Sequence, residues 1–206
     1  MKAVVFIDVQ NDFVSGSLGS EWAQKVAPNI LKFADECRDN GYMMYATLDT
    51  HLENTYNLSL EGKNLPVMHC YYGSWGHALI DGLQTTLTGK TNIYNSNCIT
   101  KPTFGSFELL YTLQHDFETR YIDNHCHLGS HTHPLPPNCG KLEESLDEII
   151  ICGFVTSICV LSNALMLRAK FPNVKITLRS DLCADINEES HQAALMVMKN
   201  CQINVI

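Results

Sequence analysis

Four strand-like segments of this sequence are each followed by a residue that could take part in nucleophilic catalysis. These residues supply a carboxylate, a carboxylate–imidazole pair, an amine and a thiol; they are Asp8, Asp49 with His51, Lys101, and Cys159. Because the carboxyl ends of parallel strands meet at one edge of a sheet, we expect these side chains to converge there. A carboxylate base, an ammonium group and a thiol in one place are typical of covalent catalysis through sulfur.

Cys159 is the most informative of these residues. It falls in the first turn of an expected helix, where the helix dipole and a nearby Lys101 would lower the pKa of its thiol. Asp8 could accept the thiol proton, and the backbone N–H groups of Val155 and Cys159 could bind a developing oxyanion. Taken singly, each of these side chains suits an ordinary structural position, so it is their joint arrival at one edge that indicates chemistry.

The strands that position these residues are predicted from apolar runs. Residues 3–7 and 149–153 are continuously apolar, which is typical of strands covered on both faces in a parallel sheet. The weaker strand candidates are 42–47, 91–94, 174–178 and 203–206.

Helical patterns lie between these strands. An apolar stripe over 30–37 predicts a helix with Pro28 near its start and Gly41 just past its end. Residues 158–171 predict a buried helix, and Asn187 is expected to cap a last helix. The core face expected for that helix is Ala194, Val197, Met198 and Cys201. This alternation predicts an α/β fold, a three-layer doubly wound (Rossmann-like) and mostly parallel sheet of about six strands with helices on both faces.

Composition narrows the classes of function. The 206 residues suffice for one core, and we expect a single domain over 1–206. The 14 Lys and Arg against 22 Asp and Glu give a net charge of −8, which argues against nucleic acid and anionic membrane surfaces as partners. No apolar run approaches the roughly 20 residues that cross a bilayer. We expect the nine cysteines to be reduced thiols of a cytoplasmic protein.

One stretch, about 123–141, departs from the alternation of strands and helices. It holds four His and two Cys among several prolines, and we predict an insertion in the domain, because a loop of this length usually has a role of its own. Its spacing fits no common zinc pattern cleanly. A surface flap or an oligomer contact is therefore the preferred interpretation, with a structural metal as the alternative.

These features together resemble the isochorismatase-like cysteine hydrolases, and within them the nicotinamidase branch. The matching segments follow the family's order over nearly the whole chain: FIDVQNDF at 6–13, DTH at 49–51, PVMHC at 66–70 with Gly73 and Gly76, Lys101 with Phe104, and GFVTSICV at 153–160. One such block alone would be weak evidence for the family. Five blocks in the family's order are strong evidence for the superfamily and good evidence for the branch.

The resemblance implies a role for each matching residue. It implies a catalytic triad of Asp8, Lys101 and Cys159, a cis peptide bond between Phe154 and Val155, and an oxyanion hole formed by the N–H groups of Val155 and Cys159. It also implies metal ligands at Asp49, His51 and His69 for one divalent transition-metal ion, with zinc expected first and iron or manganese as alternatives. No His lies between His51 and His69, so three protein ligands are expected.

The chain also departs from the branch at two positions. Pro66 stands where nicotinamidases often carry a Trp that covers the substrate ring, and Tyr56, Tyr71 or Trp75 are the candidates to replace it. Ser157 stands where Asp is frequent, which removes an expected hydrogen bond at the start of the helix. Phe13 and Phe104 remain as candidate substrate-binding residues that stack on a ring.

The resemblance implies hydrolysis of nicotinamide to nicotinate and ammonia through a thioester on Cys159, a step of NAD salvage. A first alternative keeps the triad but hydrolyses a carbamoyl or ureido compound without the metal. A second is a non-catalytic protein that binds a metal or a partner through the 123–141 stretch. The expected partners are a small-molecule amide and, because open sheets of this size often form symmetric assemblies, further copies of the chain.

Overall fold

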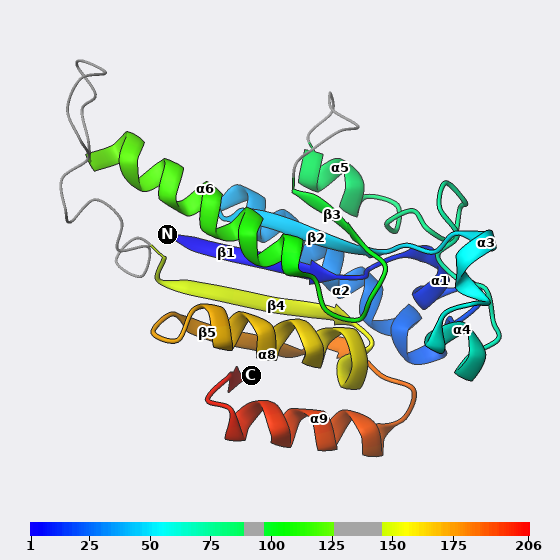
Figure 1. The fold of residues 1–206 in the computed structure, drawn as a ribbon. Coiled ribbons are helices and arrows are strands. Elements are labelled where there is room, and N and C mark those ends of the chain that lie inside the picture. The colour runs from blue at the N-terminus through cyan, green and yellow to red at the C-terminus, as the bar shows by residue number, and fades with distance from the viewer. Residues whose placement is uncertain (89–96, 126–145) are drawn as a thin grey trace.

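A computed structural model describes residues 1–88, 97–125 and 146–206 (Figure 1). Its strands are β1 (Lys2–Ile7), β2 (Met43–Asp49), β3 (Cys98–Lys101), β4 (Glu148–Phe154), β5 (Lys175–Ala184) and β6 (Asn204–Val205). Its helices are α1 (Asn11–Val14), α2 (Glu21–Asp39), α3 (Glu53–Tyr56), α4 (Leu60–Asn64), α5 (Leu83–Thr88), α6 (Phe107–His125), the π-helical turn η2 (Thr156–Val160), α8 (Leu161–Lys170) and α9 (Glu188–Asn200).

The strands form one parallel sheet in the order β3-β2-β1-β4-β5-β6. The helices α6 and α8 cover one face and α2 lies on the other (Figure 1). The central strands are apolar and buried on both sides, because helices pack on each face. The predicted doubly wound α/β fold is therefore confirmed.

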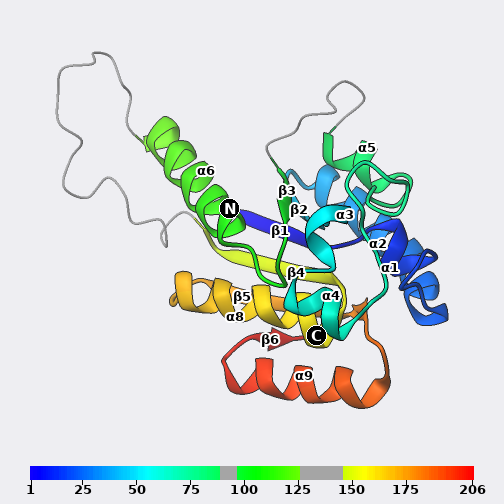
Figure 2. The same cartoon turned by 45° about the vertical axis from the view of Figure 1, so that its right-hand side comes forward.

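The strand order reverses between β1 and β4, where the chain returns from β3 to the centre of the sheet. The carboxyl ends of β1, β2, β3 and β4 lie at one edge of the sheet, beside the short helices α3 and α4 (Figure 2). Polar side chains at these strand ends are therefore expected to lie close together. Gly153 allows β4 to approach β1 closely here, because its φ is +126° and a Cβ would collide with the carbonyl oxygen of Ile7.

The third strand differs from the prediction. The segment 91–94 lies outside the described residues, and the strand that pairs with β2 is Cys98–Lys101. Lys101 is therefore the last residue of a strand rather than part of a following loop. Most of the stretch 123–141 also lies outside the described residues, which resume at 146.

Two helix predictions need correction. The helix expected to start near Pro28 begins at Glu21, because the Ser20 side chain accepts a hydrogen bond from the N–H of Ala23, and Pro28 lies inside α2. Asn187 caps α9 as predicted, but Val197 is 39% exposed. The buried face of α9 is His191, Ala194, Leu195 and Met198, a stripe with helical spacing that leaves Val197 beside it.

Among the described residues, no helix combines the length and the apolar character that spanning a membrane would require.

Candidate active site and metal centre

Asp8, Lys101 and Cys159 converge at the carboxyl edge of the sheet, as the sequence predicted. The Nζ atom of Lys101 lies 2.6 Å from Oδ2 of Asp8 and 3.6 Å from Sγ of Cys159. All three residues are buried, with exposed fractions of 0%, 2% and 4% for Asp8, Lys101 and Cys159. An acid, an amine and a thiol thus share one enclosed space.

Thr47 orients the Asp8 carboxylate. Asp8 follows β1 with φ at +49°, and its N–H donates to the carbonyl oxygen and to Oγ1 of Thr47 on β2. The Thr47 hydroxyl in turn donates to Oδ1 of Asp8 at 2.6 Å. The other carboxylate oxygen, Oδ2, is therefore the one directed toward Lys101.

Burial affects the pKa of all three side chains, Asp8, Lys101 and Cys159. It raises the pKa of the Asp8 carboxyl, and the positive charge of Lys101 opposes this shift. Burial would lower the pKa of Lys101, but the carboxylates of Asp8 and Asp49 outweigh it and hold that pKa above its usual range. Burial and the negative charge of Asp8 raise the pKa of the Cys159 thiol, although Lys101 lowers it. This net direction is opposite to the one expected from the helix dipole and Lys101, so the thiol depends on a base to lose its proton.

Cys159 lies in the π-helical turn η2 that follows β4. The peptide bond between Phe154 and Val155 is cis, as the resemblance implied. The N–H groups of Ile158 and Val160, on either side of Cys159 in sequence, both donate to the carbonyl of Val155. These two hydrogen bonds therefore close the backbone of residues 155–160 into a compact turn.

Asp185 and His191 contact two residues of this turn, Ser157 and Thr156. Asp185, directly after β5, accepts hydrogen bonds from the N–H of Ser157 at 2.7 Å and from its hydroxyl at 2.8 Å. The hydroxyl of Thr156 donates to the carbonyl of Ala184, and Nδ1 of His191 lies 3.0 Å from the same hydroxyl. Asp185 thus supplies the carboxylate that Ser157 itself lacks. The signal that could have found it is its position at a strand end.

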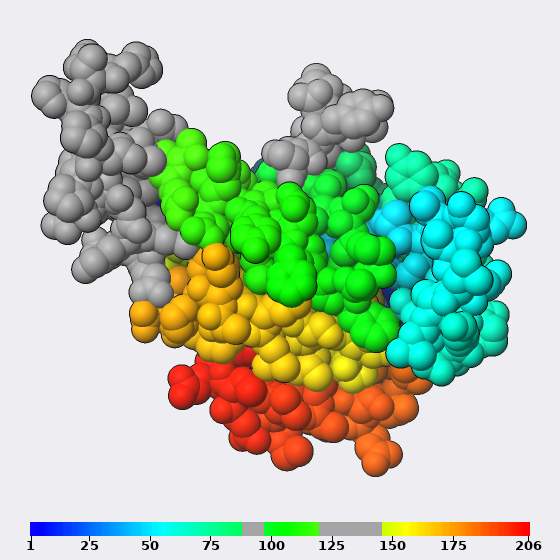
Figure 3. Space-filling model, viewed as in Figure 1, coloured from blue at the N-terminus to red at the C-terminus, as the bar shows by residue number. Residues whose placement is uncertain are grey.

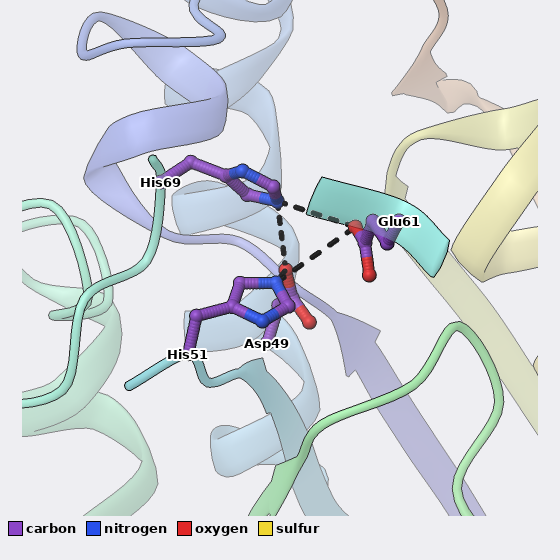
Figure 4. A group of neighbouring side chains, drawn as sticks. All are labelled: Asp49, His51, Glu61 and His69. Carbon is purple, nitrogen blue, oxygen red and sulfur yellow. Dashed lines mark hydrogen bonds and ion pairs between the residues drawn. The ribbon is translucent and has the colours of Figure 1, made fainter. Parts of the chain in front are cut away.

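A second cluster joins two imidazoles and two carboxylates, Asp49, His51, Glu61 and His69, with all ligand atoms within 4.8 Å of one another (Figure 4). Oδ2 of Asp49 lies 3.0 Å from Nε2 of His51 and 3.2 Å from Nε2 of His69. Oε1 of Glu61 lies 3.8 Å and 3.6 Å from the same two nitrogens.

Glu61 is a fourth candidate ligand beside the three expected from the sequence. It lies on α4, where the Ser59 side chain caps the helix by accepting from the N–H of Gly62. No His lies between His51 and His69, and a carboxylate in that interval was not predicted as a ligand. A short helix with a Ser cap in that interval is the signal that could have revealed it.

The backbone around the cluster is fixed by buried polar side chains. Gln10 donates to the carbonyl of Asp49 at 2.9 Å and accepts from its N–H at 2.8 Å. Nδ1 of His69 lies 2.9 Å from the carbonyl of Val67, which fixes the ring with Nε2 facing the carboxylates. Asp12 accepts from the N–H of Cys70, the residue after His69. Gln10 and Asp12, both in the 6–13 segment, thus hold the backbone at two of the candidate metal ligands, Asp49 and His69.

The four donors fit a divalent transition-metal ion. Ligand atoms about 2.1 Å from one ion at tetrahedral angles would lie about 3.4 Å apart, and the four distances between an imidazole nitrogen and a carboxylate oxygen given above are 3.0 to 3.8 Å. Burial would lower the pKa of His69, but hydrogen bonds to Asp49 and Glu61 raise it to about 10. Histidine and carboxylate donors together suit zinc, iron or manganese.

The candidate substrate-binding residues flank the two clusters differently. Phe13 is buried, and its ring lies edge-on to that of His69 with centroids 5.8 Å apart. Phe104 is 44% exposed in the loop after β3. Of the residues considered as replacements for the missing Trp, Tyr56 is buried with its hydroxyl bound to the carbonyl of Leu65, whereas Tyr71 and Trp75 are exposed.

A cleft of about 520 Å³ opens beside His51 and Lys101. It lies between the segment that carries α3 and α4 and the one that follows β3, which adjoin at the surface (Figure 3). Its lining is Thr50, His51, Leu52, Thr55, Tyr56, Ser59, Tyr72, Thr100, Lys101 and Pro102. Both the candidate triad and the candidate metal cluster therefore contribute a residue to one cleft.

The family model described as the isochorismatase domain matches residues 2–121 and 141–206. No curated protein matches the chain.

Several solved structures are similar over the whole chain. Nicotinamidase PncA from Bacillus subtilis is 23% identical over 99% of this chain and 98% of that one, with a TM-score of 0.73. The pyrazinamidase/nicotinamidase from Streptococcus mutans is 23% identical over 100% of both chains, with a TM-score of 0.72. The pyrazinamidase of Pyrococcus horikoshii, in complex with zinc, is 19% identical over 100% of this chain and 98% of that one, with a TM-score of 0.67. Similarity at these identities shows the fold alone.

Proposed function

The chain belongs to the isochorismatase family, and from this premise we propose that it is a cysteine-dependent amidohydrolase that converts nicotinamide and water to nicotinate and ammonia. The observation that carries the proposal is the buried contact of Lys101 with Asp8 at 2.6 Å and with Cys159 at 3.6 Å. The metal-ligand cluster next to this contact supports a substrate with a ring nitrogen.

In the proposed first half-reaction, Asp8 takes the thiol proton of Cys159, and Lys101 stabilises the thiolate. The sulfur attacks the carboxamide carbon, and the N–H groups of Val155 and Cys159 bind the oxyanion. A donor of this kind contributes roughly 2.7–4 kcal/mol in comparable sites. The protonated Asp8 then gives its proton to the departing amine, so that ammonia leaves and a thioester remains on Cys159.

In the second half-reaction, Asp8 acts again as a base. It takes a proton from water, the resulting hydroxide attacks the thioester carbon, and the thiolate leaves to regenerate Cys159 after accepting the proton from Asp8. The burial that raises the pKa of Asp8 supports this role, because a carboxylate with a raised pKa is a stronger base. Lys101 keeps its charge throughout, since two carboxylates face it.

Asp49, His51, Glu61 and His69 are the residues that would hold one divalent transition-metal ion, with zinc the first candidate. When bound, such an ion supplies a Lewis-acid position for the pyridine nitrogen and so orients the ring. Phe13 would pack beside that ring, since it lies against His69.

The test is an ammonia-release screen over nicotinamide, pyrazinamide, ureido compounds and carbamoyl compounds, with metal analysis of the same protein. We expect release from nicotinamide to fall to background in Cys159→Ala. The matched control is Cys201→Ala, a cysteine at the far end of α9, which should keep the wild-type rate. Unchanged release in Cys159→Ala would exclude the mechanism.

One observation favours a second candidate, hydrolysis of a carbamoyl or ureido compound by the same triad. Pro66 occupies the sequence position at which a ring-covering Trp would be expected, and Tyr71 and Trp75, two candidates to replace it, are exposed. This candidate predicts activity that persists when metal is removed by a chelator. The nicotinamidase proposal predicts a strong loss.

A further inference from the structure

Asn163 is a fully buried amide one helical turn after Cys159. Its Nδ2 group donates to the carbonyl of Cys159 at 2.8 Å and to the carbonyl of Phe104 at 3.0 Å. Its Oδ1 atom accepts from the N–H of Ser106 at 3.0 Å. Both donor hydrogens and the acceptor oxygen are therefore used, and only this orientation of the amide satisfies all three partners.

The partners of Asn163 belong to two parts of the candidate active site. Cys159 is the proposed nucleophile, whereas Phe104 and Ser106 lie in the loop 102–106 that directly follows Lys101. Ser106 also accepts from the N–H of Leu109 and so caps the start of α6. One side chain therefore connects the nucleophile's turn, the loop after the lysine and the helix beyond it.

Packing at Gly105 supports the same connection independently. A Cβ on Gly105 would collide with the sulfur atom of Met166 on α8, so the loop lies directly against the helix that carries Asn163. Phe104, next to this contact, is 44% exposed. The loop is thus held on its inner side by α8 while its aromatic residue stays accessible at the rim.

We propose that Asn163 is a positioning residue for the hydrolysis proposed above: it fixes the loop 102–106 against the turn of Cys159, and thereby sets the distance between Lys101 and Cys159 and the place of Phe104. The expected effect of Asn163 on catalytic turnover rests on the proposed function. The positioning itself is inferred from the three hydrogen bonds of the Asn163 side chain.

The chemistry of the site selects an amide at this position. An Asp would direct an oxygen at two carbonyl oxygens, and a Leu of similar size would remove all three hydrogen bonds to the two carbonyls and the N–H. A Ser retains one hydroxyl that can donate to one carbonyl. Asn163→Leu therefore removes all three hydrogen bonds, whereas Asn163→Ser can keep one of them. Both substitutions introduce uncharged side chains.

The first measurement is the rate at which iodoacetamide alkylates Cys159, followed by peptide mass spectrometry at neutral pH. We expect at least a tenfold slower rate in Asn163→Leu and a smaller decrease in Asn163→Ser. Asn200→Ser, at the exposed end of α9, is the control and should match the wild type. Because alkylation needs no amide substrate, this measurement decides the proposal even if the screen finds no amidase activity.

The second measurement separates positioning from general damage. On the best substrate of the screen, kcat is expected to fall by a larger factor than KM rises, and Asn163→Ser should recover part of kcat. Far-UV circular dichroism identifies the folded variants. If Asn163→Leu does not fold, Asn163→Ser decides the question alone. Folded variants that alkylate at the wild-type rate would overturn the proposal.

Discussion

Asp49 is the residue through which the two clusters of the site are coupled. Its Oδ2 atom faces the imidazoles of His51 and His69, and its Oδ1 atom lies 3.6 Å from Nζ of Lys101. Burial would raise the pKa of Asp49, but hydrogen bonds from His51 and His69 hold it below its usual range. The carboxylate therefore stays charged and stabilises Lys101 as well as any cation in the cluster.

Lys101 carries the clearest prediction at the residue scale. Lys101→Met would leave the carboxylate of Asp8 buried without its cation. Breaking a buried pair in this way costs about 3–5 kcal/mol. We expect a loss of this size in the free energy of unfolding, measured by urea denaturation, together with loss of ammonia release.

The matched control for that variant is Lys175→Met. Lys175 pairs with Glu148 at 2.8 Å, but its side chain is 57% exposed. Its removal leaves Glu148 with Lys2 and Thr177 as partners, so we expect a loss of about 0–1 kcal/mol. If the two variants lost the same stability, the buried pair would not be the main source of the effect.

At the scale of elements, Glu148 connects three strands at the start of β4. It accepts from Thr177 at 2.7 Å and pairs with Lys175 on β5 and with Lys2 on β1. Burial would raise the pKa of Glu148, but these partners lower it from 4.5 to about 2. The charged carboxylate thus favours the folded sheet.

The sign of this shift predicts a pH dependence. Since the folded pKa lies below the unfolded one, the stabilisation is complete above about pH 5 and disappears as the pH falls toward 2. We expect Glu148→Gln to be less stable than the wild type by about 1–2 kcal/mol at pH 7, a value reduced by solvent screening of the two lysines. Urea denaturation at pH 7 and pH 3 should show the difference shrinking, and an equal difference at both would contradict this account.

The approach of β4 to β1 gives a second prediction at this scale. Gly153→Ala would place a Cβ against the carbonyl of Ile7 at a φ of +126°, so the two central strands would have to separate. We expect a loss of at least about 3 kcal/mol in the free energy of unfolding. Gly41→Ala is the control, because its φ is +69° but nothing surrounds the added carbon, and it should cost about 1–2 kcal/mol. Comparable losses in both variants would show that contact with β1 is unimportant.

The sequence predicted those site residues that lie at strand ends, because period and apolar runs locate strands and a parallel sheet aligns their ends. Asp8 and Cys159 were found in this way. Glu61 was not, since its approach to His51 and His69 depends on how the short helix α4 folds back. Asp185 was not, although it directly follows β5, because the strand predicted there ended at residue 178, whereas β5 extends to Ala184.

At the scale of the whole molecule, the candidate metal ligands come from separate segments of the chain. Asp49 ends β2, His51 follows it, Glu61 lies on α4, and His69 comes from the loop after α4. The α3–α4 segment has exposed apolar side chains at Leu58 and Leu60. An ion bound by all four ligands would join this segment to the sheet.

Metal removal therefore has a predictable effect on global stability. An ion at 100 times its Kd stabilises the folded state by about 2.7 kcal/mol, which for a chain of this size raises Tm by roughly 5–10 °C. We expect zinc to raise Tm by this amount after treatment with a chelator, and Glu61→Gln to reduce the shift by lowering the affinity at least about tenfold. Glu53→Gln, an exposed carboxylate on α3, should behave as the wild type. An equal zinc-dependent shift in a His69→Ala variant would place the ion outside this cluster and would favour the His- and Cys-rich stretch at 123–141 as the segment that binds it.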